Sequence, residues 1–431
     1  MVTNCNKLFM RHINLIISII AILCQIQANA QTLTDTHTRI FDKSFKSLRA
    51  SVVGNDYATP VIKFGSTDKI KIEFDQLSPE MQYLRYSVVH CDANWQPSQL
   101  VDSEYTDGFN EANVENYSFS SATFAHYVHY DITIPNDDMN FLVSGNYLLK
   151  VYPEEDSETT YLQVRFSLSE DCIDIIPEIT SRTDIDYNKA NQQLSIEVDT
   201  REYYVDNMYE DLKISIIQNS RTDNMVSVNH PMRVAGRKAF FEHNRDLIFP
   251  AGNEFRRFEM TTTNYAGMGI EGYAYHDPYY HVILKTDEPR AFGSYIYDRT
   301  QYGRFTIRYS DAYDSDTEAD YMIVHFQLRM PELNGGKMYV DGEFTQHNFE
   351  SANLMHYNHN TQCYELDLML KQGAYNYQYL WVPDGTSVGK TSTVEGDFYQ
   401  TVNEYQIMVY NRKRGERYDR LIGTNIIYSG E

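Results

Sequence analysis

Short segments in which apolar and polar residues alternate recur along this chain from residue 45 onward. Clusters of glycine, proline and asparagine separate them, at intervals of roughly 8 to 20 residues. A period of two places successive side chains on opposite faces of a strand, whereas the 3.6-residue period of a helix is hard to find after residue 30. The pattern predicts an all-β protein made of tandem immunoglobulin-like β-sandwich domains.

The expected strands are distributed over the whole chain. The clearest are residues 45–52, 69–75, 86–91, 126–134, 147–152, 161–168, 193–198, 212–218, 256–262, 321–328, 337–344, 363–371 and 375–381. Tyrosine-rich stretches at residues 272–275 and 279–281 are expected to be irregular. Polar residues 169–171 mark one domain boundary, and the acidic run at 311–320 lies at the start of the last domain. The three expected domains are 31–169, 170–304, which ends in a linker, and 305–431.

The first 30 residues have the composition of a signal peptide. Lys7 and Arg11 precede an apolar run at 13–23, and the small residues at 28–30 suit cleavage before Gln31. The apolar run is shorter than the roughly 20 residues that span a bilayer. We therefore expect an exported, periplasmic protein without direct membrane insertion.

Cysteine usage leaves two questions open. Cys24 permits a lipoprotein alternative, although the residues before it are bulkier than such a site prefers. Cys91, Cys172 and Cys363 lie far apart in sequence, so we expect buried thiols, with one long-range disulfide as the alternative.

The formal net charge of −23 argues against partners that are themselves anionic. Nucleic acid and anionic lipid surfaces both repel an acidic protein. No phosphate-binding glycine loop, serine elbow or dinucleotide fingerprint occurs in the sequence. The chain is therefore expected to be non-enzymatic, with no cofactor and no small-molecule substrate.

Two histidine pairs have the residue type of metal ligands but not the spacing. His126 and His129, like His356 and His359, are three positions apart, and such residues face opposite sides of a strand. The acidic run at 311–320 lacks the glycine of a tightly turned calcium loop and is expected to be solvated. No metal site is predicted.

His90, Cys91 and Asp92 have the residue types of a catalytic triad, but they are consecutive in sequence. Neighbours on a strand point in opposite directions, so His90 and Cys91 cannot exchange a proton directly. Asp92 and Asn94 are expected to hydrogen-bond the backbone of a turn, and Trp95 is expected to bury its ring.

Residues 86–98, which read Tyr-Ser-Val-Val-His-Cys-Asp-Ala-Asn-Trp-Gln-Pro-Ser, and the Asp-Gly-Phe at 107–109 carry a family resemblance. They resemble the first domain of the type IX secretion system plug proteins of Bacteroidetes. Residues 145–152, 319–379 and 419–423 resemble further blocks of that family in the same order. The resemblance implies a plug that docks on the large outer-membrane β-barrel translocon of the system and closes its pore when idle. Loop residues Asp92, Asn94, Trp95, Tyr105 and Phe109 are the expected partner contacts.

An alternative function is glycan binding by the last domain. Its strand order resembles the early-set immunoglobulin modules found beside amylases, in which an aromatic residue stacks on sugar. The corresponding segment here, residues 342–347, lacks both the asparagine and the tryptophan of those modules. A third alternative is a structural assembly factor of the secretion system. The 36 tyrosines among 431 residues fit either exposed interface clusters or ordinary sandwich packing.

Overall fold

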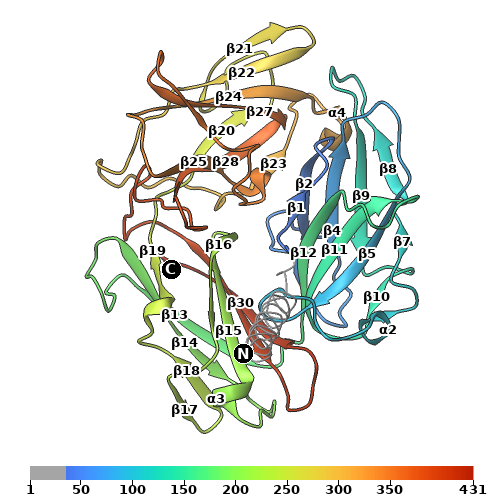
Figure 1. Ribbon diagram of the computed structural model, residues 1–431, viewed down its shortest axis with the longest axis vertical. Coiled ribbons are helices and arrows are strands. Elements are labelled where there is room, and N and C mark those ends of the chain that lie inside the picture. Colours follow the sequence, from blue (N-terminus) through green and yellow to red (C-terminus); the bar gives the residue numbers. More distant parts are fainter. Residues whose placement is uncertain (1–34, 431) are drawn as a thin grey trace, which may run out of the picture. The chain divides into compact units, whose positions relative to one another are not determined.

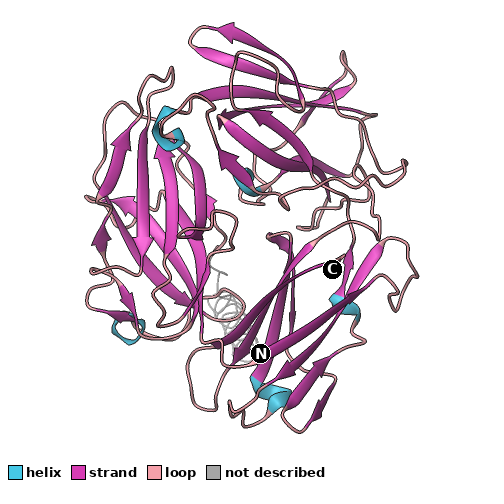
Figure 2. Cartoon of the chain, turned by 180° about the vertical axis from the view of Figure 1, so that it is seen from behind, coloured by secondary structure: helices cyan, strands magenta, loops and turns pink. Residues whose placement is uncertain are grey.

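The computed structural model describes residues 35–430, and strands make up most of its regular structure (Figure 2). The predicted signal peptide and Cys24 lie outside the described residues. The described helices are single turns: α2 (Asp102–Tyr105), α3 (Met208–Asp211), α4 (Ser315–Glu318), η1 (Arg245–Leu247) and η2 (Glu343–Thr345). Within residues 35–430, no helix has the length and apolarity needed to cross a membrane. The all-β prediction is confirmed.

The first sandwich comprises residues 36–169. One sheet has the order β1-β12-β11-β5-β7, with β3 beside β12: β1 (Arg39–Ile40), β12 (Leu162–Ser169), β11 (Gly145–Pro153), β5 (Leu84–Cys91), β7 (Ala112–Asn113) and β3 (Val61–Lys63). The facing sheet has the order β2-β4-β9-β8: β2 (Phe45–Val52), β4 (Ile70–Gln76), β9 (Val128–Ile134) and β8 (Asn116–Phe119). A two-stranded sheet joins β6 (Thr106–Asp107) to β10 (Asn140–Phe141).

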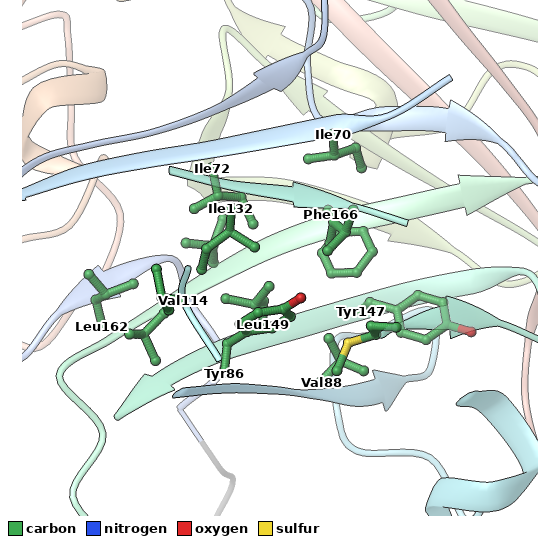
Figure 3. Close-up of a cluster of buried hydrophobic side chains, with 14 of the residues drawn as sticks. Ile70, Ile72, Tyr86, Val88, Val114, Ile132, Tyr147, Leu149, Leu162 and Phe166 are labelled. Atoms are coloured by element: carbon green, nitrogen blue, oxygen red, sulfur yellow. The ribbon is translucent and has the colours of Figure 1, made fainter. Parts of the chain in front are cut away.

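Alternating residues of the two facing sheets form one apolar core (Figure 3). Ile70, Ile72 and Ile132 from one sheet meet Val88 and Leu149 from the other, and all five are buried. The alternation seen in the sequence therefore selects the side chains that enter this core, as expected for a sandwich.

The second sandwich combines two separate parts of the chain. One sheet has the order β13-β14-β18-β17, with β19 beside β14: β13 (Asp174–Thr180), β14 (Asn191–Asp199), β18 (Lys238–Phe241), β17 (Arg233–Ala235) and β19 (Ile248–Pro250). The other has the order β16-β15-β29-β30: β16 (Arg221–Val228), β15 (Leu212–Gln218), β29 (Glu404–Asn411) and β30 (Arg420–Tyr428). β30 is the edge strand of this sheet and pairs with β29, which in turn pairs with β15, and Figure 1 shows β30 in the same part of the protein as β15 and β16.

The third sandwich lies between those two parts in sequence. One sheet has the order β20-β28-β23, with β25 beside β28: β20 (Arg256–Met260), β28 (Gly373–Pro383), β23 (Phe305–Ile307) and β25 (Gly336–Asp341). The other has the order β21-β22-β24-β27-β26: β21 (Ile270–His276), β22 (Tyr279–Leu284), β24 (Tyr321–Arg329), β27 (Cys363–Lys371) and β26 (His356–Asn358). The tyrosine-rich stretch that we expected to be irregular is the β21–β22 hairpin, so that expectation was wrong.

These pairings differ from the expected boundary at residues 304 and 305. That boundary separates β20 from its partner β28, and it assigns β29 and β30 to the last domain although they share a core with β14 and β15. We propose domains that follow the cores: 36–169, 170–250 with 401–430, and 251–400.

Candidate functional site

The loop after β5 is held by the side chain of Asp92. Its carboxylate oxygen Oδ1 accepts hydrogen bonds from the backbone N–H groups of Asn94 at 2.9 Å and Gln96 at 3.0 Å. Trp95 donates its backbone N–H to the Asp92 carbonyl at 3.0 Å and adopts a positive φ of 61°. The predicted role of Asp92 in organising a turn is confirmed, because its carboxylate accepts hydrogen bonds from the backbone of the turn. Aspartate side chains commonly stabilise turns in this way.

The Trp95 ring is buried, as predicted, with 4% of the residue exposed. It packs on Cys91 and Leu148, and the Arg165 guanidinium lies 4.4 Å from the ring centroid. The Arg165 Nε donates to the Thr36 carbonyl at 2.7 Å, so the cation that covers the ring is itself fixed. Trp95 therefore serves packing in this structure and presents no face to solvent.

Tyr105 and Phe109 follow on the same segment but have opposite environments. Tyr105, at the end of α2, is buried, and its hydroxyl lies 2.6 Å from Asp102 Oδ1 and 3.1 Å from the Val88 carbonyl. Phe109 is 88% exposed, and Asn94 is exposed as well. Of the five predicted partner contacts, Phe109 and Asn94 are the two classed as exposed. Partner binding by all five remains a prediction.

His90 and Cys91 point to opposite faces of β5, and both faces are buried. His90 contacts the ring of Tyr147 at 5.0 Å between centroids, and burial lowers the pKa of His90 to about 4. Burial raises the pKa of the Cys91 thiol to about 12, so it is not an activated nucleophile. No disulfide joins the three cysteines of the described chain; Cys91 and Cys363 are buried and Cys172 is half-buried.

The loop after β5 also joins the first sandwich to the second. Ala93 donates its backbone N–H to Asp419 Oδ2 at 2.9 Å, and Tyr410 donates its hydroxyl to Asn146 at 3.1 Å. Burial alone would raise the pKa of Asp419, but hydrogen bonds from Arg412 and Ala93 hold it below its usual range. The segment that carried the family resemblance therefore fixes one interdomain contact.

A buried carboxylate joins the first sandwich to the third. Asp75 on β4 accepts from Lys371 Nζ at 2.6 Å and from the Tyr321 hydroxyl at 2.7 Å, and His129 Nδ1 lies 2.7 Å from its other oxygen. Burial alone would raise the pKa of Asp75, but the positive charge of Lys371 and the His129 hydrogen bond lower it. Nearby, Asp320 accepts from the backbone N–H of Phe124 at 2.8 Å.

Asp320 belongs to the acidic run that we expected to be a solvated loop. That expectation fails at its end, where Ala319 and Asp320 are buried in this interdomain contact, and at α4, a single turn whose cap is Asp314. Asp311 and Asp314 are exposed, as expected.

One group of potential metal ligands among residues 35–430 comprises Glu73, His129 and Asp316. Two cations already contact these carboxylates: Arg49 lies 2.9 Å from Glu73 and 3.8 Å from Asp316, and Lys71 lies 2.5 Å from Glu73. The group is therefore an ion-pair network with its charge balanced. His126, three positions before His129, is not part of it.

The segment expected to bind sugar in the glycan alternative packs against the protein itself. Gln346 donates to the Leu48 carbonyl at 3.0 Å, and His347 Nδ1 lies 3.1 Å from Asp341. Trp381 is 8% exposed and belongs to the core of the third sandwich. Neither the segment nor Trp381 presents an aromatic platform to solvent.

Sequence reasoning missed an exposed apolar loop at residues 290–298. Phe292, Ile296 and Tyr297 are 95%, 78% and 63% exposed. Both ends of the loop are tied by ion pairs, Arg290 with Glu395 at 2.6 Å and Asp298 with Arg257 at 2.7 Å. The apolar residues of this loop are visible in the sequence. Because they do not alternate with polar residues, the pattern does not indicate whether the loop is exposed or buried.

The chain is similar to known proteins in sequence and in structure. Residues 45–170 match the family described as type 9 secretion system plug protein 1st domain. A crystal structure of a hypothetical protein from Parabacteroides merdae ATCC 43184 is 42% identical, with a TM-score of 0.90, and the match covers 92% of this chain and 100% of that one. No curated protein matches the chain.

Proposed function

This chain belongs to the type IX secretion system plug protein family, and we propose that it is a non-enzymatic periplasmic plug. It docks on the large outer-membrane β-barrel translocon of that system and closes the pore when no substrate is passing. The match of residues 45–170 to the first domain of the family carries this proposal. Closing a pore requires no bond to be made or broken, so the proposal needs no catalytic group.

A plug must resist deformation, and the contacts between sandwiches support this requirement. The Asp75–Lys371 pair and the Ala93–Asp419 hydrogen bond are both buried, so water competes poorly for them. Arg304 adds a paired contact to Glu404, at 2.7 Å and 3.1 Å, between segments of the third and second sandwiches. Buried, fully paired groups of this kind rigidify and specify an arrangement.

Docking also needs apolar surface that is not already covered. The 290–298 loop supplies Phe292, Ile296 and Tyr297, and the segment after α2 supplies Phe109. Because ion pairs fix both ends of the 290–298 loop, little conformational entropy is lost when it binds. Exposed aromatic and aliphatic anchors of this type dominate the binding energy of protein interfaces. We assign the translocon contact to these two surfaces.

Co-purification with the translocon barrel under mild detergent tests the docking. The wild-type protein should retain the barrel, and the Phe292→Ser/Ile296→Ser and Phe109→Ser variants should retain less of it. Tyr313→Ser is the matched control, because Tyr313 is fully exposed on the acidic run, away from both surfaces in sequence. Equal recovery of the barrel by all variants would reject these surfaces, and no recovery by the wild type would reject docking.

Membrane permeability in a deletion strain separates pore closure from an assembly role. An open translocon should admit large solutes, so loss of the plug should raise permeability. Co-purification with an intact permeability barrier would instead indicate an assembly factor of the secretion system.

A further inference from the structure

Four ionisable side chains meet on the outward face of the sheet that contains β22 and β24. They are His276 on β21, His281 on β22, His325 on β24 and Asp367 on β27, four strands that are consecutive neighbours in the sheet (Figure 1). None of them takes part in the contacts described above between sandwiches.

The strand registers place all four side chains on one face. His281 pairs with Ala274, so His276, two residues further along β21, shares its face. His325 pairs with Ile283, two residues beyond His281, and Asp367 pairs directly with His325. Val282 and Val324 between them are fully buried, so the histidines face away from the core.

The nitrogens of two imidazoles point at each other. His281 Nδ1 lies 2.8 Å from His325 Nε2, and the ring of His276 lies 4.8 Å from that of His281 between centroids. His325 Nδ1 lies 2.6 Å from Asp367 Oδ1. Since a carboxylate accepts, Nδ1 of His325 carries the proton and its Nε2 presents a lone pair toward His281.

This is the arrangement of a histidine prepared to bind a metal. A ligating histidine typically donates its other ring N–H to a carboxylate, which fixes the tautomer and makes the ligating nitrogen more basic. Zinc binds imidazole nitrogen at about 2.0–2.1 Å, so two such nitrogens stand about 3.3 Å apart around a tetrahedral ion. To admit the ion, the 2.8 Å pair opens by about half an ångström and both rings turn so that their lone pairs converge on one point.

We propose that His281 Nδ1 and His325 Nε2 bind a divalent transition-metal ion of the zinc class, with His276 as the third ligand after rotation of its side chain. Asp367 orients His325 and does not itself bind. On binding, the ion replaces the hydrogen bond between the two nitrogens, and the His281 proton moves from Nδ1 to the solvent-facing Nε2, so that both ligands are neutral imidazoles. The fourth position is left to water, because the site faces solvent. This site is independent of the proposed plug function.

Isothermal titration of the purified protein with zinc sulfate, after chelator treatment and without a polyhistidine tag, tests the site. We expect one zinc ion per chain. His281→Ala and His325→Ala should each weaken binding by about 100-fold or more, and Asp367→Asn by about 10–100-fold. His276→Ala should weaken it by about 10-fold. The matched control is His356→Ala/His359→Ala, which removes two exposed histidines at the β26 edge of the same sheet, outside the proposed ligand set.

Anomalous diffraction from zinc-soaked crystals gives a second readout. The expected peak lies between His281 and His325 and is absent in His325→Ala. The proposal is overturned if the wild type shows no saturable one-to-one binding, or if the control loses zinc as readily as the His281 and His325 variants. Because the four side chains face solvent, we expect the variants to keep the thermal unfolding midpoint of the metal-free protein.

Discussion

The Asp75 carboxylate and the Lys371 ammonium lie 2.6 Å apart, although 296 positions separate them in sequence. Each side chain is 1% exposed, and the pair joins β4 of the first sandwich to β27 of the third. Burial removes water from both charges, and this cost is offset by their mutual attraction and by the hydrogen bond from the Tyr321 hydroxyl to Asp75. Removing either partner would therefore leave an uncompensated buried charge.

Lys371→Met should destabilise the protein strongly. The substitution leaves Asp75 buried without its cation, and breaking such a pair costs about 3–5 kcal/mol. Urea unfolding at pH 7 measures the loss. Lys337→Met is the control, since Lys337 is exposed on β25 and should change the stability by less than about 0.5 kcal/mol. Equal effects of the two variants would show that the buried pair contributes nothing specific.

The stability contributed by Asp75 should depend on pH with a defined sign. Its pKa is lowered in the folded protein, so its contribution is complete above the unfolded pKa near 3.9 and is lost as the pH falls toward the folded value. The stability gap between wild type and Asp75→Asn should stay constant from pH 7 to pH 5. Below the unfolded pKa the gap should shrink progressively as the pH falls. A gap that widens on acidification would contradict the lowered pKa.

Gly145→Ala should destabilise the contact around His90. Gly145 has a φ of +135°, and a Cβ there would lie 2.5 Å from His90 Nε2 and 3.2 Å from the Asp419 carbonyl. We expect a loss of about 2–4 kcal/mol from backbone strain and from displacement of a buried ring. Gly54→Ala is the matched control, because Gly54 has a positive φ but open space around it, and strain alone should cost about 1 kcal/mol. Similar losses in both variants would assign the whole effect to strain.

Cys91 should resist alkylation in the folded protein. Burial raises its pKa to about 12, so almost no thiolate exists at pH 8. Cys172 is half-buried with a pKa raised to about 11 and should react slowly, whereas Cys91 and Cys363 should react only after denaturation. Mass spectrometry after iodoacetamide treatment, with and without urea, measures this. Rapid labelling of Cys91 in the native protein would contradict the burial.

Sequence patterns predicted the strands well where one face is apolar. Residues 45–52 form β2 as predicted, and the strand predicted at 69–75 appears as β4 at 70–76. The β21–β22 hairpin was missed because Ile270 is the one buried residue of β21. Apolar and polar residues therefore do not alternate along this strand in the way that marks a half-buried strand. Without that hairpin, nothing in the sequence pattern indicated that the histidines of these strands lie together on the outward face of the sheet.

The interdomain contacts could not be read from local patterns. Trp95 was expected to bury its ring, yet nothing near it indicates that Ala93 would meet Asp419, 326 positions away. The tyrosines show the same limit: Tyr147, Tyr321 and Tyr410 are fully buried in cores and interdomain contacts, whereas Tyr313 is fully exposed. Composition gives their number, and only the tertiary arrangement gives their placement.

The position of β29 between β15 and β30 has a consequence for how the chain matures. Residues 36–169 contain their own core, but the second sandwich lacks an inner strand until residues 404–411 have been made. Until then β15 has an unpaired edge, which invites aggregation or chaperone capture. Residues 401–430 therefore complete the second sandwich. A protease that removed them would leave β15 unpaired on that side and the sheet open to degradation.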